Sequence, residues 1–98
     1  MTHYLLLKFN STASVNYCKS IVAQAFSELK HAIPDIRGAN IYYNVIARDS
    51  NMDIMVQMDL KDEATLSEYL NHKLHKELIE KIHDKIDIRV TFDTNAHE

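Results

Sequence analysis

Apolar and polar residues alternate or recur with helical spacing along most of the chain. Residues 2–9 are apolar on most of both parities, which predicts a strand in the middle of a sheet. Over residues 12–32, apolar residues recur at intervals of three and four, the stripe of an amphipathic helix. Asn10, Ser11 and Thr12 supply turn and N-cap chemistry before this helix. Pro34 ends it, because a proline pushes the residue before it out of the helical region.

The second half of the chain shows the same two kinds of pattern. Residues 41–47 and 52–60 alternate between apolar and polar around the polar segment 49–51, which predicts an antiparallel hairpin. Asp62 is placed to cap a second helical stretch that reaches Ile82 and that the pattern allows to break between Asn71 and Leu74. Residues 86–92 alternate strictly and predict a last strand.

The order strand, helix, strand, strand, helix, strand predicts the fold class. Right-handed crossovers place both helices on one face of a four-stranded antiparallel sheet. We therefore expect an α+β protein with the ferredoxin-like βαββαβ arrangement. Its 98 residues fit one domain, so residues 1–98 are predicted to form a single domain.

The face of the sheet away from the helices predicts the quaternary state. The helix-facing parity is expected to be nearly all apolar. The opposite parity mixes charged residues with the apolar residues Tyr4, Leu6, Tyr42, Ile46 and Met55. Such a cluster is too large to leave in water on a small monomer, although a tolerated surface patch is the alternative. We expect a symmetric homodimer that packs two open sheet faces together as a dimeric α/β barrel.

Charge and composition exclude several classes of function. The chain has 11 Lys and Arg against 14 Asp and Glu, a net charge of -3 without long blocks of one sign, so we expect neither a nucleic-acid nor a membrane partner. Its longest uninterrupted apolar run is far shorter than the ~20 residues of a membrane span, and a signal-peptide pattern is lacking, so a cytoplasmic location is expected. Cys18 is the only cysteine, which rules out an internal disulfide and a cysteine-based zinc site.

Residues 69–75 read Tyr-Leu-Asn-His-Lys-Leu-His and resemble the Tyr-x-x-His-Pro-x-His motif of the stress-responsive A/B barrel (Dabb) domain family. Residues 3–9, 32–36 and 88–93 resemble that family's opening strand, the turn after its first helix and its closing strand. The likeness thus covers almost the whole chain in the right order. Lys73 takes the place of the family's proline, and Asp35 that of a glycine.

The resemblance implies a dimeric α+β barrel with a site between helices and sheet. Many members are known only as stress-induced proteins, while some plant members cyclise linear polyketides by an aldol condensation in which a motif histidine is the base and the motif tyrosine assists. Carried over, the resemblance implies Tyr69 and His75 as the catalytic pair. It also implies His3 and His72 as pocket or support residues. The other pocket residues expected here are Leu5, Leu7, Ile54 and Val56; a further pocket histidine of a cyclising member falls on Ile54.

Elementary chemistry agrees with a histidine and tyrosine acting together. An imidazole, with a pKa of roughly 6.5, suits the removal of a proton beside a carbonyl, and a phenol can donate a hydrogen bond to the enolate. We expect the protein to bind a small hydrophobic or carbonyl compound, with a cofactor-free cyclase or lyase, or a cofactor-free monooxygenase, as alternatives.

The histidines also have plainer interpretations. His3 can simply satisfy a buried hydrogen-bonding group, and His72 and His75 lack the third ligand that a metal site needs, so we expect no metal and no cofactor. An enzyme would need an open pocket of roughly 300 Å³ or more. A collapsed pocket would favour a structural or stress-protective dimer.

Overall fold

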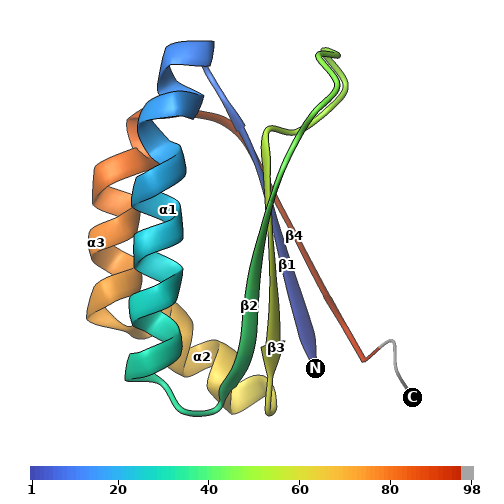
Figure 1. Cartoon of the computed structure of the whole chain (residues 1–98). Coiled ribbons are helices and arrows are strands. Elements are labelled where there is room, and N and C mark those ends of the chain that lie inside the picture. The colour runs from blue at the N-terminus through green and yellow to red at the C-terminus, as the bar shows by residue number, and fades with distance from the viewer. Residues whose placement is uncertain (96–98) are drawn as a thin grey trace.

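The computed structural model describes residues 1–95, which form one antiparallel sheet with its helices on one side (Figure 1). The strands are β1 (Thr2–Phe9), β2 (Ile36–Tyr43), β3 (Ile54–Leu60) and β4 (Ile86–Thr94). The helices are α1 (Thr12–Ala32), α2 (Glu63–Asn71) and α3 (Lys73–Ile82), and a short 3₁₀ turn, His83–Lys85, leads into β4. The strand order is β2-β3-β1-β4 with antiparallel neighbours throughout. The predicted ferredoxin-like α+β fold is therefore confirmed.

The helices begin where the sequence supplies caps. The Ser11 hydroxyl accepts a hydrogen bond from the Ser14 amide at 3.1 Å, and an Asp62 carboxylate oxygen accepts one from the Thr65 amide at 3.0 Å. Each bond satisfies an amide that has no partner inside the helix. α1 ends two residues before Pro34, as expected.

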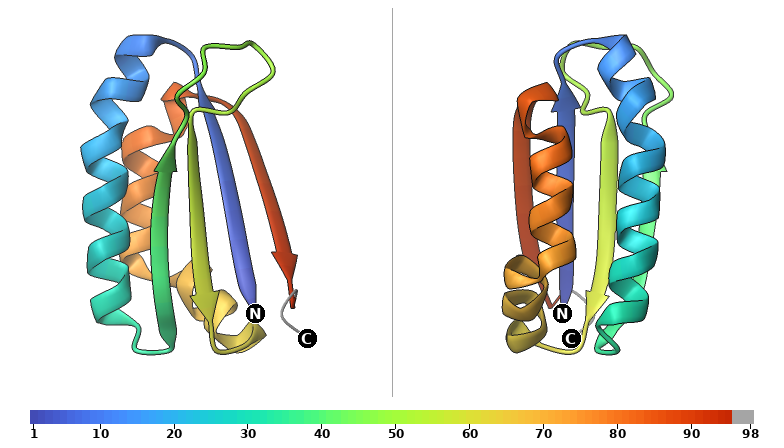
Figure 2. Two further views of the ribbon diagram at one scale, coloured as in Figure 1. Left: turned by 45° about the vertical axis from the view of Figure 1, so that its right-hand side comes forward. Right: turned by 90° about the vertical axis from the view of Figure 1, so that its left-hand side faces the viewer.

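The core lies between the helices and the sheet, and α1 and α3 run alongside each other over the strands (Figure 2). Its members come from both layers and are almost fully buried. They include Leu5, Leu7, Phe9, Cys18, Val22, Phe26, Leu29, Ile54, Val56, Met58, Tyr69, Leu78 and Ile82. None of the helices within residues 1–95 has the length and apolarity that crossing a membrane requires.

The two strands of the predicted hairpin pair over fewer residues near the turn than the alternating pattern indicated. β2 ends at Tyr43 and β3 begins at Ile54, so residues 44–53 form a loop that extends beyond the sheet (Figure 2). The Asn44 side-chain amide donates to the Ile46 carbonyl at 2.6 Å, and the Asn51 side-chain amide donates to the Asn44 side-chain oxygen at 3.0 Å. These local bonds compete with strand pairing. Ile46 therefore lies in the loop and not on the sheet face, where it had been expected.

The helix-facing side of the sheet was expected to be nearly all apolar, but in β4 the apolar residues face away from the helices and the polar residues face toward them. Tyr4 pairs with Phe92 and Leu6 with Val90, so the apolar row of β4 shares the open side of the sheet with Tyr4 and Leu6. Arg89, Thr91 and Asp93 consequently face the helices. Ile86 is an exception, because the register shifts between Lys8 and Phe9. Ile86 therefore pairs with Phe9 and faces the helices, where it lines a cavity. That part of the prediction is wrong because alternation alone does not state which parity turns inward.

The open side of the sheet is more apolar than the sequence suggested, because it also carries the apolar row of β4. We call this surface the open face. Tyr42, Ile88, Val90 and Phe92 are 44–62% exposed there. The open face comprises Tyr4, Leu6, Tyr42, Met55, Ile88, Val90 and Phe92.

Candidate functional site

A break between α2 and α3 brings the motif tyrosine and histidine together. Tyr69 lies in the last turn of α2 and His75 in the first turn of α3. Between them His72 has an extended backbone, and its Nδ1 atom accepts a hydrogen bond from the Leu74 amide at 3.0 Å. The break therefore forms with Lys73 in place of the family's proline, since a histidine cap at residue 72 starts the new helix. His72 acts here as a helix cap and does not line the cavity beside Tyr69.

The Tyr69 and His75 rings meet edge to face, with their centroids 4.6 Å apart and an angle of 62° between the rings. His75 Nδ1 lies 3.1 Å from the Leu70 carbonyl oxygen. A carbonyl can only accept, so Nδ1 carries the proton and Nε2 of the neutral ring keeps its lone pair. The neutral ring can therefore act as a general base only through Nε2.

The surroundings keep both groups in useful protonation states. Burial lowers the pKa of His75, and the Arg89 charge lowers it further, whereas the bond to Leu70 opposes the change. Burial raises the pKa of the Tyr69 phenol well above its ordinary value, with Arg89 opposing. At neutral pH His75 is therefore an uncharged acceptor and Tyr69 a protonated donor.

A second histidine supports the tyrosine from the sheet. His3 is 3% exposed, and its ring centroid lies 5.8 Å from that of Tyr69. Its Nδ1 lies 2.5 Å from an Asp93 carboxylate oxygen, so the carboxylate fixes the proton of His3 on this nitrogen. Asp93, His3, Tyr69 and His75 are thus successive neighbours, the first two joined by a hydrogen bond and the three rings by contact.

Two residues of this site, Arg89 and Asp93, are absent from the sequence-based site. They occur on the polar parity of β4, which looked like a solvent-facing row. They could have been found by assigning the apolar residues of β4 to the same side of the sheet as Tyr4 and Leu6. Once that row faces outward, the charged row must face the helices.

An inner cavity lies beside Tyr69 and His75, and Leu5 and Leu7 form part of its wall. Its volume is about 10 Å³, room for about one water molecule. That is far below the roughly 300 Å³ expected of an open enzyme pocket, so the inner cavity is closed in the single chain, and in this closed state it favours a structural or stress-protective dimer. Ile54 and Val56 are buried in the core but do not line it. Its lining residues are Leu5, Leu7, Val22, Phe26, Tyr69, His75, Leu78, Ile79, Ile82, Ile86 and Arg89.

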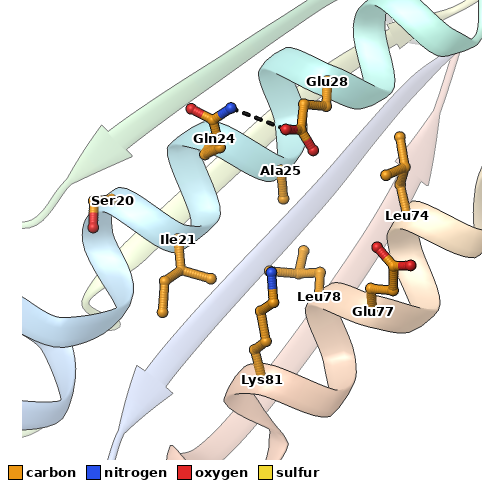
Figure 3. Close-up of a pocket in the computed structure, with 9 residues that line it drawn as sticks. All are labelled: Ser20, Ile21, Gln24, Ala25, Glu28, Leu74, Glu77, Leu78 and Lys81. Atoms are coloured by element: carbon orange, nitrogen blue, oxygen red, sulfur yellow. Dashed lines mark hydrogen bonds between the residues drawn. The ribbon is translucent and has the colours of Figure 1, made fainter.

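A larger hollow, the helix groove, lies between α1 and α3 (Figure 3). It has a volume of about 350 Å³, with Ile21 and Ala25 on one side and Leu74 and Leu78 on the other. Charged side chains, among them Glu77, also line it. Leu78 lines both the helix groove and the inner cavity, so this one side chain stands between them.

The remaining candidate chemistry is limited. Within residues 1–95, no three or more His, Cys, Asp and Glu side chains gather in a way that could hold a metal ion. Cys18 is buried in the core, and burial raises the pKa of its thiol, which keeps it protonated and unreactive.

The lowered pKa of His75 predicts a pH dependence of stability. An unfolded histidine takes up a proton below about pH 6.5, whereas the folded site resists protonation to lower pH. The stabilisation from His75 is therefore complete above pH ~6.5 and is lost as pH falls through the lower, folded-state pKa. We expect the free energy of unfolding, measured with urea, to fall less steeply from pH 7 to 5 in His75→Gln than in the wild type.

The matched control is His31→Gln, which replaces an exposed histidine on α1. It should keep the wild-type slope. Equal slopes for wild type and His75→Gln would show that His75 titrates as it does in the unfolded chain.

The fold defines the class, a ferredoxin-like α+β protein, and the buried tyrosine–histidine pair marks a candidate site under its helices. The chain belongs to the stress responsive A/B barrel domain family, whose model matches residues 1–96. The resemblance seen in residues 69–75 and in residues 3–9, 32–36 and 88–93 is thereby confirmed.

Solved structures show the same fold. A dimeric ferredoxin-like protein of unknown function from Thermobifida fusca is 24% identical, with 93% of this chain and 85% of that chain covered and a TM-score of 0.74. One from Bacteroides fragilis is 15% identical, with coverage of 95% and 94% and a TM-score of 0.79. A putative antibiotic biosynthesis monooxygenase from Bacteroides thetaiotaomicron is 9% identical, with coverage of 97% and 87% and a TM-score of 0.81. No curated protein sequence matches the chain significantly.

Proposed function

We propose that the protein is a homodimer in which each chain binds a small hydrophobic or carbonyl compound in the inner cavity, enlarged when the ligand enters. The observation that carries this proposal is a buried phenol donor beside an imidazole acceptor, Tyr69 and His75, in an otherwise largely apolar wall. Residues 1–98 act as one domain in this proposal. A cytoplasmic location and a part in stress responses stay predictions.

The open face supports the homodimer. It forms a row of apolar side chains across all four strands, and its β4 members are largely exposed in the single chain. Packing two such faces removes both from water in one symmetric contact. The proteins of this fold from Thermobifida fusca and Bacteroides fragilis are dimeric, which agrees with this arrangement.

Ligand entry requires the inner cavity to expand, and Leu78 supplies the simplest route. Its side chain separates about 10 Å³ of enclosed space from the 350 Å³ helix groove. Exchange between rotamers of a leucine would join the two spaces without a change in the fold. We therefore propose the helix groove as the entrance.

Acid–base chemistry on a carbonyl ligand is a second candidate function, and the tautomer of His75 favours it. Nε2 can take a proton from the carbon beside the carbonyl group; the electron pair of the broken C–H bond then forms the C=C bond of an enolate, and the π pair of the C=O bond moves onto the oxygen. The Tyr69 hydroxyl would donate a hydrogen bond to that oxygen. Monooxygenase activity is supported by fold likeness alone, and we do not propose it.

Binding can be tested by titrating 2-octanone, a neutral ketone with an apolar chain, into isotope-labelled protein. We expect saturable NMR shifts at Leu5, Tyr69, His75 and Leu78, because the ketone would replace cavity contacts. Shifts should be absent from the open face, which the partner chain covers. Failure to saturate up to the solubility limit of the ketone, or shifts confined to the open face, would contradict the proposed binding.

His75→Phe separates binding from catalysis. A binding site tolerates the change, since phenylalanine keeps the ring shape, and the ketone affinity should stay within about threefold of the wild type. Proton exchange at the carbons beside the ketone carbonyl, followed by deuterium incorporation, would be lost if His75 is a base. Exchange at the same rate with and without His75 would sink the catalytic candidate.

A further inference from the structure

We propose that Arg89 binds the carboxylate of the ligand, so that the inner cavity selects hydrophobic monocarboxylic acids over neutral compounds of the same length. This inference rests on the proposed function and narrows its ligand class. It is carried by the position of one cation among otherwise mostly apolar cavity walls.

Arg89 reaches the site from the edge of the sheet. It pairs with Leu7 across β1 and β4, on the helix-facing side, and lines the inner cavity together with Tyr69 and His75. Arg89 is exposed at the same time, which its position on the edge strand β4 allows. The charge of Arg89 is felt by both rings, since it acts on the pKa of His75 and of Tyr69.

The guanidinium group has no anionic partner of its own within residues 1–95. None of the ion pairs there includes Arg89, although Asp87 and Asp93 belong to the same strand. Asp93 is held by His3 and lies four residues further along β4, a distance of roughly 13 Å in an extended strand. At physiological ionic strength, charges that far apart are largely screened where solvent reaches them. Arg89 is therefore available to an incoming anion.

The wall of the cavity specifies the rest of the ligand. Val22, Phe26, Ile79 and Ile82 offer only hydrocarbon, which suits an alkyl or aryl chain. A guanidinium can donate two parallel hydrogen bonds to a carboxylate, whereas a ketone offers one oxygen without charge. The combination fits a small amphipathic acid with one negative charge.

The test compares three probes of similar chain length: octanoate, 2-octanone and n-octylamine. We expect the wild type to bind octanoate roughly 10- to 100-fold more tightly than 2-octanone, the range of a charge-assisted hydrogen-bonded contact, and n-octylamine most weakly. In Arg89→Gln, octanoate should lose this advantage while 2-octanone keeps its affinity. Arg89→Lys should retain part of it, since the charge remains but the paired donors do not.

Arg37→Gln is the matched control, because Arg37 is an exposed arginine on β2, at the other edge of the sheet. It should bind all three probes as the wild type does. If 2-octanone binds to the cavity and octanoate binds no more tightly, the role of Arg89 is refuted while the proposed function stands. If neither probe binds, both fail. Retained ketone binding in Arg89→Gln shows that this variant is folded.

Discussion

Replacing Leu6 with glutamate is expected to convert the proposed homodimer into a folded monomer. Leu6 lies on a central strand of the open face, between Met55 of β3 and Val90 of β4. In the dimer the substitution would place two uncompensated carboxylates in a desolvated contact, each costing several kcal/mol. The dissociation constant should rise at least about a thousandfold, which corresponds to ~4 kcal/mol. The single chain should tolerate the change, since the glutamate would then face water.

Sedimentation at micromolar concentration measures this outcome directly. Tyr17→Glu is the matched control, because Tyr17 is 56% exposed on α1, on the opposite layer. It should remain dimeric. A wild type that sediments as a monomer, or a Leu6→Glu variant as dimeric as the wild type, would mean that the open face is not the interface.

The second large effect is expected from Leu78→Ala. Removing the side chain that separates the inner cavity from the helix groove should join the two spaces. The free energy of unfolding should drop by about 2–5 kcal/mol, the usual cost of truncating a buried leucine. The 2-octanone affinity should rise, because a ligand would fill the new space and recover part of the lost contact.

Leu29→Ala is the control for this variant. Leu29 is fully buried on α1 but lines neither the inner cavity nor the helix groove. It should cost a similar amount of stability without any gain in ketone affinity. Equal ketone affinity in Leu78→Ala and the wild type would exclude Leu78 as the barrier to entry. Unfolding by urea and a ketone titration on each variant decide the matter.

Much of the fold could be predicted because local chemistry and periodicity agree. Ser11 and Asp62 cap the helices as expected, and Pro34 follows the end of α1. The break between α2 and α3 was also foreseen. The loop over residues 44–53 was not, because its alternation matches a strand while the side chains of Asn44 and Asn51 bond locally instead.

The candidate site could be predicted only in part. Tyr69 and His75 belong to one short motif, so the sequence places them near each other. Arg89 and Asp93 join them through the pairing of β1 with β4, a long-range register that no local pattern encodes. The closed state of the cavity was equally out of reach, since it depends on how side chains such as Leu78 fill the space.

Strand β4 has two working surfaces. Ile88, Val90 and Phe92 lie on the open face, the proposed dimer contact, while Arg89, Thr91 and Asp93 lie on the helix-facing side. A register shift of one residue in β4 would exchange its two rows of side chains. Charged residues would then lie in the proposed dimer contact, and an apolar side chain would take the place of Arg89. The proposed dimer contact and the proposed ligand site therefore use alternate residues of the same nine-residue strand, so a change of register that disturbs one also disturbs the other.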